Sequence, residues 1–162
     1  MTDEADDDGA RRRIVVDGIT IGAVTGAYGV SFGAVAVAAG LTPVQACVLS
    51  LAMFTGGSQF AMVGTIAGGA SPFAGAATAV LLGVRNAFYG LQLSRVLEAG
   101  GTRRLLAAHL VIDESAAMGS IPGRSRAERR LGFWVTGAAV FVGWNLMTLV
   151  GAIGADALED PG

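Results

Sequence analysis

Three groups of polar residues interrupt the apolar stretches of this sequence, and each could do chemistry in a membrane. The first is Thr55-Gly56-Gly57-Ser58-Gln59, near the middle of an apolar segment. An unpaired backbone N–H or C=O is costly in hydrocarbon, so such a break is tolerated only against protein or a water-filled cavity. Broken helices in transporters present backbone dipoles to substrates. A substrate site here competes with a simple kink or packing site.

The second group is Arg85-Asn86, inside another apolar segment. An arginine at the centre of a membrane helix costs about 2.5–3.5 kcal/mol on the insertion scale, so it usually has a partner or faces a polar cavity. Its guanidinium could hold a substrate carboxylate through two parallel hydrogen bonds. The alternative is that Arg85 extends its long side chain to the membrane interface.

The third group is His109, Asp113 and Glu114 in a short apolar segment. Residues four apart are neighbours on one face of a helix, so His109 and Asp113 are expected to lie side by side. A histidine with carboxylates in a membrane segment is typical of a proton relay or an ammonium site. The alternative is an interfacial amphipathic helix whose polar face is wet.

The elements that must position these groups are membrane helices. The chain has 162 residues, of which 52% are hydrophobic and only 15% charged, against about 25% charged in a typical soluble domain. No Asp, Glu, Lys or Arg occurs in residues 18–84 or in residues 131–155. Because one crossing takes about 20 apolar residues, the first stretch has room for about three crossings and the second for one.

The predicted fold is all-α, a multi-pass transmembrane bundle with four to five membrane segments. The long apolar segments are residues 18–40, 43–67, 72–93 and 131–155, and a shorter one lies at 105–121. If all four long segments cross, the Arg11–Arg13 cluster and the arginines of residues 95–130 fall on opposite sides, against the tendency of positive charge to stay cytoplasmic. Either the 43–67 segment is re-entrant, broken at Gly56-Gly57, or the 105–121 segment is an extra crossing.

The predicted domain organisation has three parts: a disordered polar tail at 1–13, a transmembrane domain at 14–155, and an acidic tail or point of truncation at 156–162.

Glycines recur on one face of the first span, which predicts a helix-packing surface, because glycine lets membrane helices approach closely. Hinges are the alternative role for these residues. The stripe consists of Gly18, Gly22, Gly26, Gly29 and Gly33.

Several function classes lack their signatures. The sequence has no zincin, nucleophile-elbow or phosphate-loop motif, so we expect neither an enzyme nor an ATPase. Basic residues do not interleave with aromatic ones as in nucleic-acid-binding proteins. Cys47 is the one cysteine, which excludes an internal disulfide and a cysteine-based metal site. We expect no cofactor and no metal.

The arrangement of these motifs resembles the AzlC family of branched-chain amino acid permeases, over nearly all of residues 18–155. Each motif alone is weak, and their order and spacing together are fairly specific. The motifs are Gly26-Ala-Tyr-Gly-Val-Ser-Phe-Gly33, Gly40-Leu-Thr-Pro-Val-Gln-Ala46, Met53-Phe-Thr-Gly-Gly-Ser-Gln-Phe60, Gly83-Val-Arg-Asn-Ala-Phe-Tyr-Gly90, Ala108-His-Leu-Val-Ile-Asp-Glu-Ser115 and Gly143-Trp-Asn145.

The resemblance implies a multi-pass protein of the bacterial inner membrane that exports branched-chain amino acids or analogues by secondary transport. It also implies a small membrane subunit of the AzlD type as partner, for which the glycine stripe is a plausible docking face. Relatives often carry histidine where this chain has Asn86, which weakens a role for this position in proton coupling. They also usually continue through further apolar helices, so we expect this chain to be shortened at its C-terminus.

The leading hypothesis is a permease subunit for a small zwitterion. Arg85 would hold the carboxylate, Thr55–Gln59 and Asn86 would add polar contacts, and His109 with Asp113 or Glu114 would attract the ammonium or carry a proton. A non-transporting membrane scaffold that packs through the glycine stripe is the alternative. An intramembrane hydrolase using Ser58 or the Asp113-Glu114 pair has little support, because no base is spaced to activate Ser58.

Overall fold

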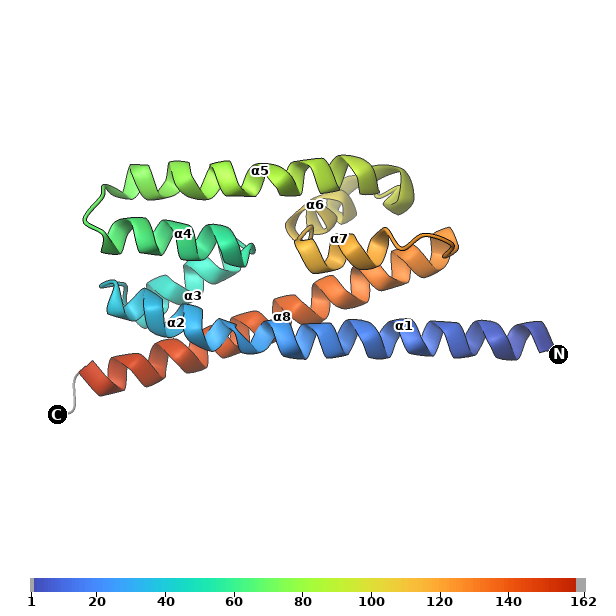
Figure 1. The fold of residues 1–162 in the computed structure, drawn as a ribbon, viewed down its shortest axis with the longest axis horizontal. Coiled ribbons are helices and arrows are strands. Elements are labelled where there is room, and N and C mark those ends of the chain that lie inside the picture. Colours follow the sequence, from blue (N-terminus) through green and yellow to red (C-terminus); the bar gives the residue numbers. More distant parts are fainter. Residues whose placement is uncertain (1, 160–162) are drawn as a thin grey trace. The chain divides into compact units, whose positions relative to one another are not determined.

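The computed structural model describes the backbone of residues 2–159 and the side chains of residues 8–158, and it contains helices and no strand in that range. The all-α prediction is therefore confirmed for the described chain (Figure 1). The helices are α1 (Thr2–Ala27), α2 (Gly29–Ala38), α3 (Pro43–Ala52), α4 (Gly56–Ala67), α5 (Pro72–Leu97), α6 (Gly101–His109), α7 (Asp113–Gly119) and α8 (Arg126–Glu159).

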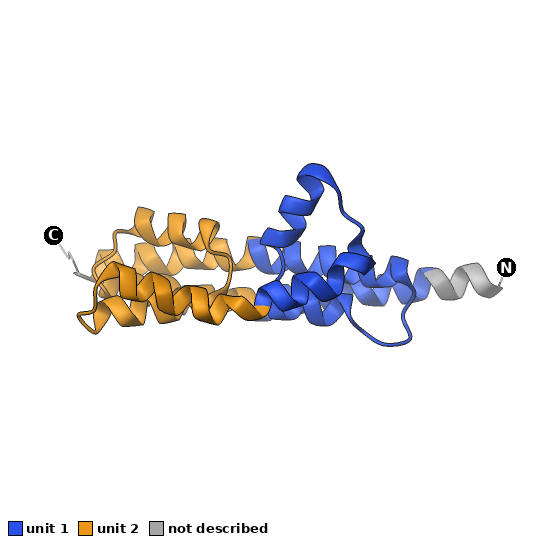
Figure 2. Cartoon of the chain, turned by 90° about the horizontal axis from the view of Figure 1, so that it is seen from above, with its two compact units in different colours: residues 1–24, 86–141 blue, residues 25–85, 142–162 orange. Residues whose placement is uncertain are grey.

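The chain forms two compact units, coloured separately in Figure 2. Unit 1 comprises residues 1–24 and 86–141, and unit 2 comprises residues 25–85 and 142–162. Helices α1, α5 and α8 each contribute residues to both units.

Two helical stretches among the described residues are long and apolar enough to cross a membrane, Asp8–Ala38 and Arg126–Leu158. The first joins α1 and α2 through a turn at Tyr28. Only 39% and 28% of their most apolar windows are buried inside the protein, whereas the core helix of a soluble protein is mostly buried. The exposed apolar surface of these helices fits contact with lipid.

The chain ends differ from the predicted tails. Helix α1 begins at Thr2, so the segment that we expected to be disordered is helical from its second residue. Extending a formed helix adds one hydrogen bond per residue without a new nucleation cost, which lets polar residues continue it. Helix α8 likewise continues to Glu159, into the predicted acidic tail. Met1 and residues 160–162 lie outside the described residues.

In unit 2, the predicted broken segment is a pair of short helices, α3 and α4. Helix α3 starts at a capping box: Thr42 Oγ1 accepts from the Gln45 N–H at 3.2 Å, and Gln45 Oε1 accepts from the Thr42 N–H at 2.9 Å. This exchange satisfies two N–H groups that a helix start leaves unpaired. The break lies at Met53–Thr55, slightly earlier than the predicted Thr55–Gln59, and Gly56 is already the first residue of α4.

The glycine stripe packs within the chain, against α8. In unit 2, a Cβ added at Gly26 would lie 2.9 Å from the backbone of Gly143, and one added at Gly33 would overlap the carbonyl oxygen of Thr148. In unit 1, a Cβ at Gly18 would lie 2.8 Å from Thr136 Oγ1. Gly22 and Gly29 meet the backbone of α8 in the same way. All five glycines of the stripe therefore face α8 within the chain.

The core of unit 1 joins α5, α6, α7 and α8. Its buried cluster contains Leu93, Leu97, Ala107, Val111, Ala116 and Phe133. Arg130 on α8 closes the end of α5, donating from Nε to the Val96 carbonyl at 2.7 Å and from Nη2 to the Leu97 carbonyl at 2.9 Å. These carbonyls belong to the last turn of α5, which has no helical donors left.

The predicted short segment at 105–121 is not one helix. Helix α6 ends at His109 and α7 begins at Asp113, with residues 110–112 between them. The expectation that His109 and Asp113 share one helical face is therefore wrong. Ser115 stabilises the break, because its hydroxyl accepts from the Ile112 N–H at 3.1 Å and donates to the Leu110 carbonyl at 2.6 Å.

Candidate substrate site at the start of α4

The start of α4 presents backbone donors that its own helix does not use. The first helical bond runs from the Gln59 N–H to the Thr55 carbonyl at 3.0 Å, so the N–H groups of Gly56, Gly57 and Ser58 have no acceptor within the helix. Thr55 has an extended backbone and gives no side-chain cap. An uncapped helix start carries a partial positive charge and suits a carboxylate.

Arg85 on α5 adds a full positive charge to this helix start. Its Nη2 atom lies 3.2 Å from where a Cβ at Gly57 would stand, so the guanidinium rests against the α-carbon of this residue. A side chain at position 57 would crowd this guanidinium, which would have to shift by a few tenths of an ångström. Arg85 is an exposed residue, and its position is within reach of a ligand seated on the first turn of α4.

Ser58 completes the polar groups at this end of α4. Only 2% of its surface is exposed, and its hydroxyl has no hydrogen-bond partner in the described structure. A Cβ at Gly83 on α5 would lie 3.6 Å from this hydroxyl, so the group faces α5. Leaving a buried hydroxyl unpaired costs about 1–3 kcal/mol, and a ligand that accepts its proton would recover that energy.

Gln59 has a different role from its neighbours. Its side chain is fully buried, its Nε2 donates to the carbonyls of Ser50, at 3.3 Å, and Met53, and its Oε1 accepts from Trp144 Nε1 at 2.9 Å. The two carbonyls lie at the end of α3, where helical donors run out. Since its amide is occupied by protein groups, we infer that Gln59 holds the break together instead of touching substrate.

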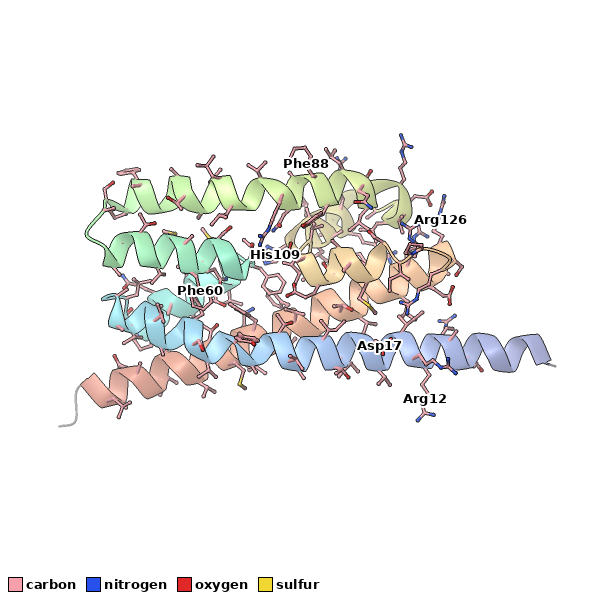
Figure 3. All side chains as sticks on the ribbon, viewed as in Figure 1. Arg12, Asp17, Phe60, Phe88, His109 and Arg126 are labelled. Carbon is pink, nitrogen blue, oxygen red and sulfur yellow. The ribbon has the colours of Figure 1, made fainter. Side chains whose placement is uncertain are left out.

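Three residues of this region had not been singled out as site residues in the sequence: Trp144, Ser50 and Phe32. The Trp144 ring stacks on Phe32 at a centroid distance of 6.3 Å and meets Phe60 edge-on at the same distance (Figure 3 labels Phe60). A tryptophan deep in a charge-free segment was the available signal, because its indole N–H needs an acceptor when buried.

The remaining predicted residues belong to unit 1. Asn86 lines a groove between α5 and α6. His109 packs edge-on against Phe141, with ring centroids 5.7 Å apart. Asp113 and Glu114 stand in the first turn of α7, where carboxylates complement the helix dipole. Among the described residues, no three His, Cys, Asp or Glu side chains are grouped as metal ligands would be.

The part of the chain that matches a known protein family contains this site and all three polar groups. Residues 20–158 match the family described as AzlC protein. The chain belongs to the AzlC family. Together with the exposed apolar helices, this makes it a membrane protein with a permease-type role in amino acid transport. No curated protein and no solved structure matches the chain.

In this AzlC chain, residues of one sequence motif take different positions in the fold, and a residue of another motif joins some of them. Gly56, Gly57, Ser58 and Arg85 meet in unit 2 around one helix start. Gln59, from the same sequence motif, points into the core and joins α3, α4 and α8.

Proposed function

We propose that this chain is the large subunit of an exporter for branched-chain amino acids or close analogues, working by secondary transport in the bacterial inner membrane. The observation that carries the proposal is the start of α4, where an uncapped helix end, an arginine and an unpaired buried hydroxyl converge. Backbone N–H groups and a guanidinium are the donors that carboxylates prefer.

The proposed site holds the carboxylate of a zwitterion. Its oxygens accept from the N–H groups of Gly57 and Ser58, from the Ser58 hydroxyl and from the Arg85 guanidinium. The neutral donors fix orientation, while Arg85 supplies the charge that makes an anion favourable in a low-dielectric setting. His109, Asp113 and Glu114 remain the proposed groups for the ammonium or for proton coupling.

The short lengths of α3 and α4 support a re-entrant arrangement of this segment. With 10 and 12 residues they are about 15 and 18 Å long, against a hydrocarbon core of about 30 Å. Neither helix crosses alone, and together they would bring the start of α4 to mid-membrane depth. The proposed bundle then has four to five membrane segments, with an AzlD-type small subunit beside it.

Two other functions have less support. A scaffold that docks through the glycine stripe would need a free stripe, whereas α8 already packs on Gly26 and Gly33. A hydrolase would need a base on Ser58, whose hydroxyl has no hydrogen-bond partner in the described structure.

The test is efflux of valine, leucine and isoleucine from proteoliposomes, with and without the small subunit. We expect Arg85→Ala to reduce efflux at least tenfold and Arg85→Lys to restore part of it. Arg95→Ala is the matched control, because Arg95 is an exposed arginine on the same helix. Full efflux in Arg85→Ala would refute the assignment of the site, and no efflux of any of the three amino acids by the two-subunit complex would refute the function.

A further inference from the structure

A groove of about 690 Å³ lies between α5 and α6 in unit 1, apart from the residues assigned to substrate. Its walls are mostly small and aliphatic, with polar groups at few points. The residues that matter for its chemistry are Asn86, Gly90, Leu91, Ser94, Arg104 and Ala108.

The length of the groove matches one leaflet of a bilayer. On α5 it runs from Asn86 to Leu97, which is about 16 Å at 1.5 Å per residue. Half of the hydrocarbon core is about 15 Å. The α5 wall near Leu91 is open, since that residue is 70% exposed. A straight aliphatic chain therefore fits along this groove.

Arg104 places a positive charge at the end of the groove next to the α5–α6 connection, which Leu97 and Ala99 also line. The neighbouring arginines are engaged inside the unit: Arg103 lies over the Trp134 ring at 5.3 Å, and Arg130 closes α5. Arg104, by contrast, has no hydrogen bond or ion pair with the described part of the chain. Its guanidinium is available to an anion outside the protein.

We propose that this groove binds one anionic phospholipid, with the phosphate on Arg104 and an acyl chain along Leu91, Gly90 and Ala87. A guanidinium suits a phosphate because it offers two parallel donors, and basic pockets between membrane helices bind anionic lipid headgroups. An amino acid fits less well, because its charged groups sit on one carbon, whereas the groove extends for about 16 Å along α5, from Asn86 to Leu97. This inference rests on the proposed bundle, in which α5 is a membrane segment, and not on the proposed transport.

The test measures lipid binding to the purified full chain in neutral detergent by native mass spectrometry, with phosphatidylglycerol and phosphatidylcholine as probes. We expect phosphatidylglycerol to bind more tightly and Arg104→Gln to weaken it at least about fivefold, the equivalent of about 1 kcal/mol for one basic residue near a lipid surface. Arg95→Gln, which removes an exposed charge outside the groove, should leave binding unchanged.

A second pair of variants tests the acyl chain without disturbing the fold. A Cβ at Gly90 would meet no atom within 4 Å, so the leucine of Gly90→Leu can enter the groove, and it should weaken phosphatidylglycerol binding at least fivefold. Gly64→Leu is the control, because Gly64 on α4 has the same open surroundings. The proposal fails if phosphatidylglycerol binds no better than phosphatidylcholine, or if Arg104→Gln and Gly90→Leu bind it as the unaltered chain does.

Two competitors separate the lipid from simpler occupants. Glycerol 1-phosphate carries the anionic headgroup without acyl chains, and leucine represents the proposed substrate. Neither should displace phosphatidylglycerol at millimolar concentration if the acyl chain supplies much of the affinity. Displacement by glycerol 1-phosphate would show a plain anion site, and displacement by leucine would show a substrate groove; either result overturns the proposal.

Discussion

The indole nitrogen of Trp144 donates a 2.9 Å hydrogen bond to the side-chain oxygen of Gln59, which lies 85 positions earlier in the chain. Both side chains are buried, and the Gln59 nitrogen closes the end of α3 through the Ser50 and Met53 carbonyls. One amide thus ties α8 to α3 and α4. The start of α4 keeps its position because this contact fixes the break beside it.

Trp144→Phe should lower the free energy of unfolding by about 1–3 kcal/mol, because it leaves the buried Gln59 oxygen without a donor. Gln59→Leu should cost at least as much, since it leaves the indole N–H without an acceptor and removes a donor from the Ser50 and Met53 carbonyls. The double variant should lose less unfolding free energy than the sum of the two single losses, because the shared hydrogen bond is removed only once. Thermal unfolding in detergent measures this coupling, and strictly additive losses would contradict the proposed clamp.

Ser58→Ala should separate stability from transport. Removing an unpaired buried hydroxyl should leave the free energy of unfolding unchanged or raise it by about 1 kcal/mol. If the hydroxyl binds substrate, KM for efflux should rise about five- to tenfold, the equivalent of about 1 kcal/mol or slightly more. Ser50→Ala is the matched control, because the buried Ser50 hydroxyl lies 3.4 Å from Thr148 Oγ1. It should lower stability and leave KM unchanged; the opposite pattern would remove Ser58 from the site.

Gly33→Ala and Gly64→Ala should have effects of opposite sign. A methyl group at Gly33 overlaps the Thr148 carbonyl oxygen, so α2 and α8 must separate, and we expect a loss of about 1–3 kcal/mol as in other overpacked cores. Gly64 on α4 has open space around the same position, so alanine should gain about 0.5–1 kcal/mol from its helix propensity. Equal unfolding temperatures for the two variants would contradict the α2–α8 contact.

Arg130→Ala should destabilise the protein more than Arg126→Ala does. Arg130 donates to the two last carbonyls of α5 and to Glu98, so its loss should cost about 1–2 kcal/mol. Among the described residues, Arg126 pairs only with Glu98, and its side chain is 60% exposed, where an ion pair contributes about 0–1 kcal/mol. Arg126 is labelled in Figure 3. Salt should reduce the Arg126 effect and leave most of the Arg130 effect.

Local patterns in the sequence predicted much of the helical structure. The charge-free stretches indicated apolar helices, and the glycine spacing indicated a packing face. The Thr42-Pro43-Val44-Gln45 run contains both side chains of the capping box that starts α3. These features depend on residues within one or two turns of each other, so their spacing alone carries the information. Family membership also followed from the order of short motifs.

Tertiary contacts decided the rest. The glycine spacing could not say that α8 covers the face, because the partner residues lie more than 100 positions away. At the end of α3, the Met53 carbonyl accepts from the Gln59 amide, whose oxygen in turn accepts from Trp144. The same contacts separate Gln59, held in the core, from Ser58, which keeps an unpaired hydroxyl one residue earlier. The sequence therefore determined which residues within the apolar segments are polar. Packing across the fold decided which of these polar groups already have a hydrogen-bond partner and which are left for a ligand. The physical reason is that a buried polar group is stable only where a partner reaches it.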